Sequence, residues 1–421
     1  MSDLRMNGLH HAAYEGSIEQ TVALLSQGSI DIDESDRKGF TPLMYTAVYA
    51  QPLVAKILVS KGANVSLVCG GGLTALHYSV YSGNVDVAKV LVNAGADPEG
   101  APVVDSFTPL HIATNGGHWE VMRVLIEAGA NVDSLAGENR TPLFIAALEG
   151  HVDAARELLR AKANPVLRSM HPLTGKTWLP LDIAAFKGHL EVIKEMVRHV
   201  GIEGCGGACG GVHALALAAE GNHVDILAIL TDAGVVDTGE ALFQAAGFGC
   251  VTSVKMLLRK HKGQSTGEEV YANATHAGRK TALSNSIWHC RSGSPKVVRL
   301  LVDAGADTTS AVPLEVTSWG EVEWSQTPLA LTEISLDQET VGDQDATEQQ
   351  LNNLTAIRRL LLQAEAVHAV SWLWHSGAAE RAMTTTTPST QLTLMMPVLR
   401  RRAARRGVLL AALCSRQSSK P

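Results

Sequence analysis

Apolar positions and turn-forming residues alternate along the chain, and residues 106–133 show the pattern most clearly. Thr108 is suited to cap a helix, because a threonine side chain accepts a hydrogen bond from a free backbone N–H at a helix start. Pro109 suits the first helical position, where no N–H is needed. Gly116-Gly117 then stops the helix, because glycine adopts the left-handed conformation at little cost. This half of the segment predicts a short helix that ends in a tight turn.

The other half of the segment predicts a second helix. After His118, the residues Val121, Val124 and Leu125 recur at helical spacing, and Gly129 stops the helix. The unit is therefore a helix, a turn, a helix and a loop. Two helices this short cannot bury their apolar sides alone, so the pattern also predicts neighbouring units of the same kind.

The same unit returns along the chain, as the position of one leucine shows. That leucine is found at Leu9, Leu43, Leu76, Leu110, Leu143, Leu181, Leu215, Leu242, Leu283 and Leu329. The first intervals are 34, 33, 34 and 33 residues, and the later ones are 38, 34, 27, 41 and 46 residues. A constant interval of this size indicates repeats that stack on one another. The array is therefore regular in its first half and irregular in its second half.

Two short motifs recur with this leucine. The first precedes it in Phe40-Thr41-Pro42-Leu43, Leu73-Thr74-Ala75-Leu76-His77, Phe107-Thr108-Pro109-Leu110-His111 and Arg140-Thr141-Pro142-Leu143. The second ends the second helix in Gly62-Ala63-Asn64, Gly95-Ala96-Asp97, Gly129-Ala130-Asn131 and Gly305-Ala306-Asp307. On these motifs the chain resembles an ankyrin-repeat protein, well over residues 4–310 and poorly over residues 311–370. The resemblance implies an all-α solenoid of helix-turn-helix units with short β-hairpin fingers.

The repeats lose regularity toward the C-terminus. We expect about nine ankyrin repeats in residues 1–310 that become degenerate after residue 200, a degenerate last repeat or C-terminal cap in residues 311–375 with an acidic insert at 321–348, and a disordered linker and basic tail in residues 376–421. A Gly/Cys run at residues 201–211 takes the place of the hairpin in the seventh repeat. Because stacking acts between neighbours, repeats seven to nine are predicted to open more easily than repeats two to five.

The composition is that of a soluble globular chain and bears on the compartment. Hydrophobic residues make up 46% of the chain, and the mean hydropathy is +0.07. No stretch approaches the about 20 apolar residues that cross a bilayer. The N-terminus has no apolar run of the kind that marks a secretory signal. We therefore expect a cytoplasmic protein, with a nuclear location left open, whose six cysteines stay reduced.

The formal net charge of −7 hides an acidic body and a basic tail. Residues 376–421 hold eight Lys and Arg and one acid, a net charge of +7, so the preceding residues carry −14. Five arginines of the tail form a cluster at Arg400, Arg401, Arg402, Arg405 and Arg406. This cluster is interpreted as a nuclear-import signal, as a contact with a membrane surface or nucleic acid, as an intramolecular partner of the acidic insert, or as a solvated basic end.

Few residues suggest chemistry. Cys205, Cys209 and His213 are of the types that bind zinc, but zinc sites usually show closer, paired spacing and four ligands. The favoured interpretation is a glycine-rich hairpin in which the cysteines are small fillers. Histidines recur at family pattern positions, where the ring bonds the neighbouring backbone or the adjacent repeat: His77, His111, His118, His151, His189 and His223. We expect no catalytic residue, no metal and no cofactor.

Aromatic residues at positions that stacking does not require are the most informative set. In an ankyrin stack, the residue before Thr-Pro-Leu-His lies on the finger, and the pair before the inter-helix glycine faces the concave groove. Finger positions hold Phe40, Leu73, Phe107, Arg140 and Trp178, and groove positions hold Tyr14, Tyr49, Tyr81, Leu148 and Phe186, beside Glu15, Asn115, Glu149 and Lys187. Only 5% of the chain is aromatic, so this concentration predicts binding hot spots. The alternative is local packing between neighbouring fingers.

The resemblance implies a non-catalytic scaffold or adaptor that binds a partner protein in the concave groove of repeats one to six. The predicted hot spots are Phe40, Tyr81, Phe107, Trp178 and Phe186. The alternative is an adaptor that regulates localisation, with the Arg-rich tail as a nuclear-import or membrane-surface signal. We expect a monomer with no small-molecule substrate, no nucleic-acid partner and no membrane contact other than a surface contact of the tail.

Overall fold

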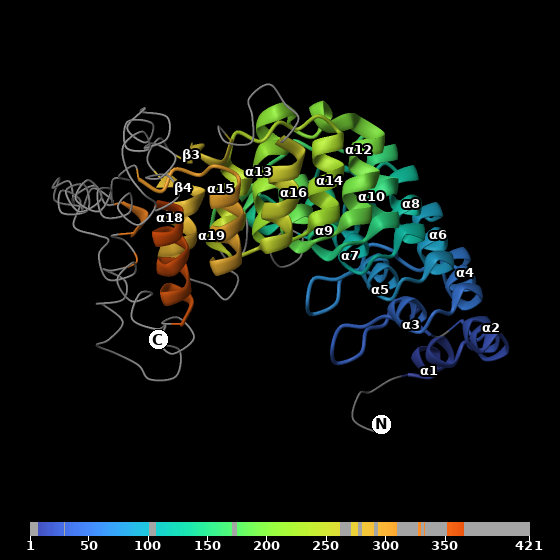
Figure 1. Ribbon diagram of the computed structural model, residues 1–421. Helices are drawn as coiled ribbons and strands as arrows, with labels where there is room; N and C mark the ends of the chain where they lie inside the picture. The colour runs from blue at the N-terminus through green and yellow to red at the C-terminus, as the bar shows by residue number, and fades with distance from the viewer. Residues whose placement is uncertain are drawn as a thin grey trace, which may run out of the picture. The chain divides into compact units, whose positions relative to one another are not determined.

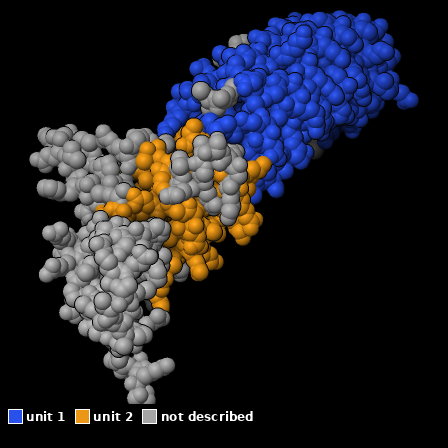
Figure 2. Space-filling model, turned by 45° about the horizontal axis from the view of Figure 1, so that its top comes forward, with its two compact units in different colours: residues 1–236 blue, residues 237–421 orange. Residues whose placement is uncertain are grey.

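The computed structural model describes residues 7–28, 30–100, 107–170, 175–261, 271–276, 280–289, 294–309, 327–329, 332 and 352–365. The predicted basic tail with its arginine cluster, and most of the predicted acidic insert, lie outside these residues. The chain divides into two compact units, Met1–Val236 (unit 1) and Asp237–Pro421 (unit 2), which Figure 2 shows in different colours. Each unit is described by itself below.

The described part of unit 1 is built of consecutive helix pairs, one pair for each repeat. The first helices of the pairs are α1 (Gly8–Glu15), α3 (Pro42–Val48), α5 (Ala75–Tyr81), α7 (Pro109–Asn115), α9 (Pro142–Glu149), α11 (Pro180–Lys187) and α13 (Gly207–Glu220). The second helices are α2 (Ile18–Ser26), α4 (Pro52–Ser60), α6 (Val85–Asn93), α8 (Trp119–Glu127), α10 (Val152–Arg160), α12 (Leu190–Gly204) and α14 (Val224–Asp232). The predicted order of helix, turn, helix and loop is therefore confirmed in these repeats.

The helices of unit 1 form two layers. Each first helix contacts the second helix of its pair, consecutive first helices contact one another, and so do consecutive second helices. In Figure 1 the first helices lie along the inner side of the curve that unit 1 makes, and the second helices lie along its outer side. The expected all-α solenoid of helix-turn-helix units is confirmed.

The core lies between the two layers, and the repeated leucine anchors it. This side chain is exposed by 1% or less in every repeat, at Leu9, Leu43, Leu76, Leu110, Leu143, Leu181, Leu215, Leu242, Leu283 and Leu329. Alanines such as Ala12, Ala47 and Ala113 are buried at 0% exposure in the same first helices. Because alanine is small, it lets neighbouring helices approach closely while still burying apolar surface.

The predicted start signals are used as expected. Thr108 is the N-cap residue of α7. Its backbone N–H donates to Nδ1 of His111 over 3.3 Å, and its hydroxyl lies 2.9 Å from the same nitrogen. Thr141 caps α9, and its Oγ1 accepts a hydrogen bond of 3.1 Å from the backbone N–H of Phe144. These bonds use backbone donors that a helix start would otherwise leave without a partner.

Glycine suits the turn between paired helices for two reasons, which Gly150 shows, although Ala50 and Asn222 adopt positive φ at the equivalent turns of two other repeats. Its φ of 78° lies in the left-handed region, which other residues adopt at a cost. A Cβ atom at Gly150 would also lie 2.6 Å from Nδ1 of His189, the histidine of the next repeat. Gly188 repeats the arrangement, with φ of 82° and an added Cβ atom 2.6 Å from Cε1 of His223. The glycine therefore makes room for the following repeat as well as for the turn.

The fingers are shorter than hairpins in the first repeats. The finger before α3 closes with a hydrogen bond from the Asp36 N–H to the Phe40 carbonyl (2.9 Å), and the next closes from Cys69 to Leu73 (2.9 Å). Two-stranded hairpins are described as β1 (Ser169–Met170) with β2 (Thr177–Trp178), and as β3 (Thr275–His276) with β4 (Lys280–Thr281). Residues Ala136 and Arg140 form an isolated bridge around the 3-10 turn η2 (Gly137–Asn139).

The prediction of a glycine-rich hairpin at residues 201–211 is wrong. Helix α12 continues through a kink at Gly201, where φ is 68°, and ends at Gly204. Helix α13 then begins at Gly207. The low helix propensity of glycine is overridden by packing, because α13 lies against α11, α12 and α14.

The described part of unit 2 is also built of helix pairs, joined by less regular connections. Its helices are α15 (Glu240–Gly247), α16 (Val251–His261), α18 (Ala282–His289) and α19 (Ser294–Asp303), and residues 352–365 are also helical. Helix α15 contacts α16 and α18, and α19 contacts α16 and α18. The helix predicted at residues 351–370 is thus present at residues 352–365, with Leu354, Ile357 and Leu361 buried.

Candidate binding face

The inner face of unit 1 is formed by the fingers and by those residues of the first helices that point away from the second helices. Helix α5 shows how the helical period sorts the side chains. Leu76 and Val80 point to the second layer and are exposed by 1% and 0%, whereas Tyr81 is 76% exposed. Tyr78, three residues before Tyr81, is on the same side of the helix. The inner face therefore consists of side chains that the core does not use.

Aromatic rings cover the inner face of the first three repeats. Ring centroids are 4.5 Å apart for Tyr14 and Tyr49, 6.3 Å for Tyr45 and Tyr49, 5.6 Å for Phe40 and Tyr45, and 4.9 Å for Phe40 and Tyr78. Edge-to-face and offset pairs of this kind stabilise one another. We call this surface, with Tyr81 at its end, the tyrosine face. The rings pack locally, as the alternative prediction has it, while Tyr49 (46%) and Tyr81 (76%) stay exposed, and binding at these rings stays a prediction.

A buried carboxylate fixes the first finger to the tyrosine face. Oδ1 of Asp36 accepts hydrogen bonds of 2.8 Å from the backbone N–H groups of Lys38 and Phe40. Its Oδ2 accepts a hydrogen bond of 2.9 Å from the hydroxyl of Tyr45. Burial first, and then the bond to Asp36, raises the pKa of Tyr45 to about 12. The Tyr45 ring therefore holds one orientation under the exposed rings.

In the second finger, a thiol takes the place of the carboxylate as the partner of a tyrosine hydroxyl. Cys69 stands 33 residues after Asp36, and Sγ of Cys69 lies 3.2 Å from the hydroxyl of Tyr78. The N–H of Gly71 donates to the same sulfur over 3.4 Å. Although burial raises the pKa of the Cys69 thiol, the hydrogen bonds from Tyr78 and from backbone N–H groups lower it overall. Burial, and then the contact with Cys69, raises the pKa of Tyr78.

The finger residues of the third and fourth junctions are partly covered. Leu73 and Phe107 are half-buried, and the Phe107 ring lies 5.6 Å from the ring of His111. Nε2 of His111 lies 3.1 Å from the carbonyls of Ser134 and Arg140, so this buried ring joins two repeats. Its burial lowers the pKa of His111 despite these bonds. The side chain of Arg140 pairs with Glu138.

The prediction that Trp178 is an exposed hot spot is wrong. Trp178 is 5% exposed, and its ring lies 5.3 Å from the ring of Phe186 and 6.0 Å from the ring of His213. It stands on β2, opposite Ser169 of β1, so the longer hairpin of this repeat turns its side chain inward. Phe186, which covers it, remains half-buried. At this repeat the local-packing interpretation is the correct one for Trp178.

The inner face of repeats four to six has fewer rings and more aliphatic side chains. Asn115 and Lys187 are exposed, and Leu148 and Phe186 are half-buried. At three of these positions, a histidine of the next repeat donates a hydrogen bond to the backbone carbonyl. His151 lies 3.1 Å from the Asn115 carbonyl, His189 lies 3.1 Å from the Leu148 carbonyl, and His223 lies 3.3 Å from the Phe186 carbonyl, through Nε2 in each case. The prediction that pattern histidines bond neighbouring backbone is confirmed here.

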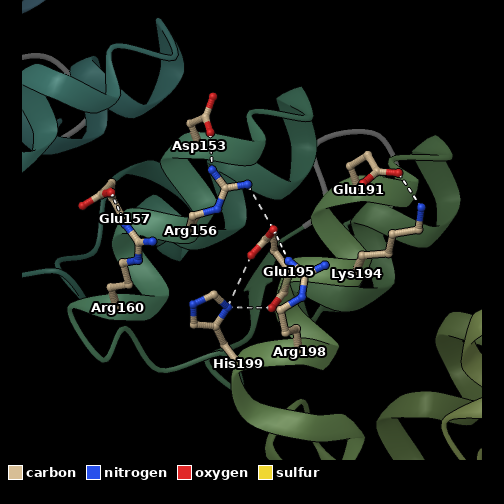
Figure 3. A network of polar contacts seen from close by, with 9 residues as sticks. All are labelled: Asp153, Arg156, Glu157, Arg160, Glu191, Lys194, Glu195, Arg198 and His199. Carbon is tan, nitrogen blue, oxygen red and sulfur yellow. Dashed lines mark hydrogen bonds and ion pairs between the residues drawn. The ribbon is translucent and has the colours of Figure 1, made fainter.

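The outer face of unit 1 differs, because its charged side chains pair with one another. Glu195 of α12 accepts hydrogen bonds from Arg156 of α10 (3.0 Å) and from Arg198 (2.5 Å), and lies 3.5 Å from His199 (Figure 3). Within single helices, Arg156 also pairs with Asp153. The sequence carries a signal for this network, because its acids and bases stand three residues apart in successive second helices, which is the spacing of helical ion pairs.

The structure also describes two of the three residues that were considered as zinc ligands, Cys205 and His213. Cys205 is buried at 0% exposure, and burial raises the pKa of its thiol to about 12. His213 pairs instead with the buried carboxylate of Asp182, at 3.1 Å. The side chain of Cys209 lies outside the described part of the chain. Within the residues that the structure describes, no group of three His, Cys, Asp or Glu side chains is placed to hold a metal ion.

Two residues of the tyrosine face were missed in the sequence. Tyr45 and Tyr78 follow the Thr-Pro-Leu or Thr-Ala-Leu motif by two residues and are not among the residues predicted to bind. Their signal was available, because Tyr45 precedes Tyr49 by four residues and Tyr78 precedes Tyr81 by three, which places each pair on one helix side. Among the described helices, none is long and apolar enough to cross a membrane.

Comparison with known proteins identifies the repeats. The family model described as "Ankyrin repeats (3 copies)" matches residues 9–101 and 99–169. These residues include the tyrosine face and the inner face of repeats four and five. The crystal structure of the human ASB11 ankyrin repeat domain is similar at 26% identity, with a TM-score of 0.40, over 46% of this chain and 84% of that one.

Curated relatives match over short segments. The E3 ubiquitin-protein ligase KEG of Arabidopsis thaliana is 36% identical over 94 residues, which is 22% of this chain and 6% of that protein. The palmitoyltransferase AKR1 of Candida glabrata is 36% identical over 95 residues, which is 22% of this chain and 12% of that protein. The human NAD-capped RNA hydrolase NUDT12 is 33% identical over 85 residues, which is 20% and 18% of the two chains. The chain thus spans less than a fifth of these relatives.

Proposed function

We propose that this chain, whose residues 9–169 are ankyrin repeats, binds a partner protein through the inner face of unit 1 and is itself non-catalytic. Ankyrin repeats generally mediate protein–protein interaction. The observation that carries the proposal is the exposure of Tyr81 (76%) and Tyr49 (46%) on a packed array of helices. Large rings on a rigid scaffold bury much area at a low cost in side-chain entropy, which favours binding hot spots.

The inner face is preferred over the outer face for a physical reason. On the outer face, charges such as those of Arg156 and Glu195 already satisfy one another. On the inner face, the exposed rings do not contribute to the core, because the repeated leucine and alanine positions fill it. Positions that folding does not constrain can hold side chains that suit a partner. The protein is proposed to act as a scaffold or adaptor, as a monomer.

An affinity capture with a double variant tests this proposal. Tyr81→Ala and Phe107→Ala together remove two inner-face rings without touching the leucine core. We expect the proteins captured by the wild-type chain to be reduced severalfold, since each hot-spot truncation costs about 1–2 kcal/mol. Leu53→Ala is the matched control, because Leu53 is apolar, 61% exposed and on the outer layer. Equal capture of the same proteins by the double variant and the wild type contradicts the proposal.

A second candidate function rests on the charge of the C-terminal tail. The +7 of residues 376–421, concentrated in the arginine cluster, supports a role in directing the chain between cytoplasm and nucleus or to a membrane surface. Deletion of residues 394–421 separates the two functions. If the deletion changes localisation but does not change capture of partner proteins by the inner face, the tail acts as a localisation signal. If localisation is unchanged, the cluster is a solvated end.

A further inference from the structure

The inner face of unit 1 changes its chemistry along the array. Five of the six tyrosines of the chain, Tyr14, Tyr45, Tyr49, Tyr78 and Tyr81, belong to repeats one to three. In repeats four to six, the positions of Tyr14 and Tyr81 are held by Asn115, Leu148 and Phe186, and those of Tyr45 and Tyr78 by Ile112, Ile145 and Ile183. A purely apolar partner would be served equally by leucine and phenylalanine. The restriction of tyrosine to one end therefore points to a partner that uses the ring faces of tyrosine.

Tyrosine faces attract cations. The π-system carries partial negative charge on its faces, and a guanidinium or ammonium placed over it is stabilised by about 0.5–2 kcal/mol, depending on its exposure. Tyr81 is 76% exposed and Tyr49 is 46% exposed, so a partner side chain can reach both rings. Tyr14 and Tyr49 meet edge to face at 72°, and the Tyr45 ring lies nearly parallel to the Tyr49 ring, with the centroids 6.3 Å apart.

The surrounding charge favours the same kind of partner. Residues 1–50, which include Tyr14, Tyr45 and Tyr49, hold seven Asp and Glu against three Lys and Arg, whereas residues 51–100 hold three against three. Glu15 follows Tyr14 on α1, its side chain is 45% exposed, and it lies 3.4 Å from Nδ1 of His11. The neighbouring finger adds exposed Asp31 and Glu34 and, at its tip, Arg37 and Lys38. The part of the tyrosine face formed by Tyr14, Tyr45 and Tyr49 thus lies in a stretch of net negative charge.

We propose that the tyrosine face binds an extended, arginine-containing segment of a partner protein, with guanidinium groups stacked on Tyr49 and Tyr81 and a further arginine paired with Glu15. This inference rests on the proposed function and names the class of partner. Arginine fits better than lysine, because its planar guanidinium stacks on a ring and is more weakly hydrated. The net negative charge of residues 1–50 would also speed encounter with a basic segment at low ionic strength.

Labelled peptides test this directly. The purified full chain is titrated by fluorescence anisotropy into a flexible Gly/Ser peptide with arginine at every third position. Matched peptides have lysine, or uncharged citrulline, in place of each arginine. We expect the arginine peptide to bind about fivefold more tightly than the citrulline peptide, and measurably more tightly than the lysine peptide. Affinity for all three that is equal within error overturns the proposal.

Variants locate the site. Tyr81→Ala and Tyr49→Leu are each expected to weaken the arginine peptide by about threefold to fivefold, and Glu15→Gln by a smaller factor that vanishes at high salt. Leu53→Ala on the outer layer is the control and should leave binding unchanged. Both tyrosines are exposed, so circular dichroism should show unaltered helix content. Arginine-peptide binding that survives both tyrosine variants reflects general attraction to an acidic surface and also overturns the proposal.

The two proposals can fail separately. Leu148→Ala with Phe186→Ala alters the inner face of repeats five and six and leaves the tyrosine face intact. If these variants abolish capture of partner proteins while the peptides show no preference for arginine, the inner face binds proteins and the inference about arginine is wrong. If neither pair of variants affects capture, the proposed function itself is wrong.

Discussion

Arg156 of α10 donates a hydrogen bond from Nη2 to Oε1 of Glu195 of α12 over 3.0 Å, and so ties the outer helices of two consecutive repeats (Figure 3). The Glu195 side chain is only 7% exposed, while Arg156 is 32% exposed. Arg156→Ala leaves the carboxylate buried without this partner. We expect a loss of about 1–2 kcal/mol in the free energy of unfolding, less than for a fully buried pair because water reaches the arginine.

Urea denaturation of the full chain measures this loss. Lys194→Ala is the matched control, because it removes an ion pair of 2.6 Å with Glu191 that is exposed on the same helix. Its expected cost is below about 0.5 kcal/mol. Equal losses for the two variants would show that the contact between repeats adds nothing to stability.

The same carboxylate predicts a pH dependence. The hydrogen bond from Arg156, and next that from Arg198, outweigh burial and hold the pKa of Glu195 below its ordinary value of 4.5. A carboxylate with a lowered pKa in the folded state contributes stability that is complete above pH 4.5 and is lost as the pH falls through the folded pKa. The stability difference between wild type and Glu195→Gln should therefore be constant near neutral pH and shrink below pH 4.5. A difference that grows on acidification contradicts this assignment.

Substitutions of two turn glycines distinguish the stability cost of backbone strain from that of steric overlap. Gly129 and Gly150 both have positive φ, at 95° and 78°, but only Gly150 has a neighbour, His189, within reach of an added Cβ atom. Gly129→Ala should cost about 1–2 kcal/mol from the left-handed conformation alone. Gly150→Ala should cost more, and part of that excess should disappear in the double variant with His189→Ala. Thermal unfolding of the four proteins decides the point, and equal costs for both glycines would refute it.

The Asp36 carboxylate is expected to stabilise the first finger. Asp36→Ala removes the acceptor for two backbone N–H groups and for the Tyr45 hydroxyl, at an expected cost of about 2 kcal/mol. The pKa of Tyr45, now about 12, should fall because the negative neighbour is gone. Chemical denaturation and spectroscopic titration of tyrosine report the two effects. Asp31→Ala, which removes one exposed acceptor in the same finger, should cost far less stability and leave the pKa of Tyr45 unchanged.

Stability is predicted to vary along the array. Repeats two to five keep a nearly constant interval and a complete Thr-Pro-Leu or Thr-Ala-Leu motif, whereas repeats seven to nine have intervals of 27 to 46 residues around them. Native-state hydrogen exchange should show slower opening of α3 to α10 than of α13 to α19. Uniform protection across these helices would contradict the link between repeat regularity and local stability.

The sequence predicted the framework well for reasons that particular residues make clear. Leu110 and its equivalents are buried in every repeat because a helix pair has one apolar side, and the helical period reveals it. Thr108, Pro109 and Gly117 act within a few residues of their own positions. The roles of such residues can be predicted from the sequence, because their partners are their neighbours in the chain.

The failures concern residues whose surroundings come from another repeat. Trp178 occupies a finger position like Phe107, but a longer hairpin and the ring of His213 cover it. The Gly/Cys run at residues 201–211 has low helix propensity, yet residues 201–204 belong to α12 and residues 207–211 to α13, and both helices contact α11 and α14. Tyr45 was missed because its role depends on Asp36 and on the rings of neighbouring repeats. Such features require the stacking geometry.

The histidines that reach back to the carbonyls of Asn115, Leu148 and Phe186 have a thermodynamic consequence for recognition. Each holds the last turn of an inner helix from the following repeat, at the place where an inner-face side chain begins. The main chain under these side chains has little conformational freedom left to lose when a partner arrives. Binding to such a surface loses little backbone entropy, so more of the free energy of the contacts appears as affinity. The affinity of the inner face is thus set partly by residues that no partner touches.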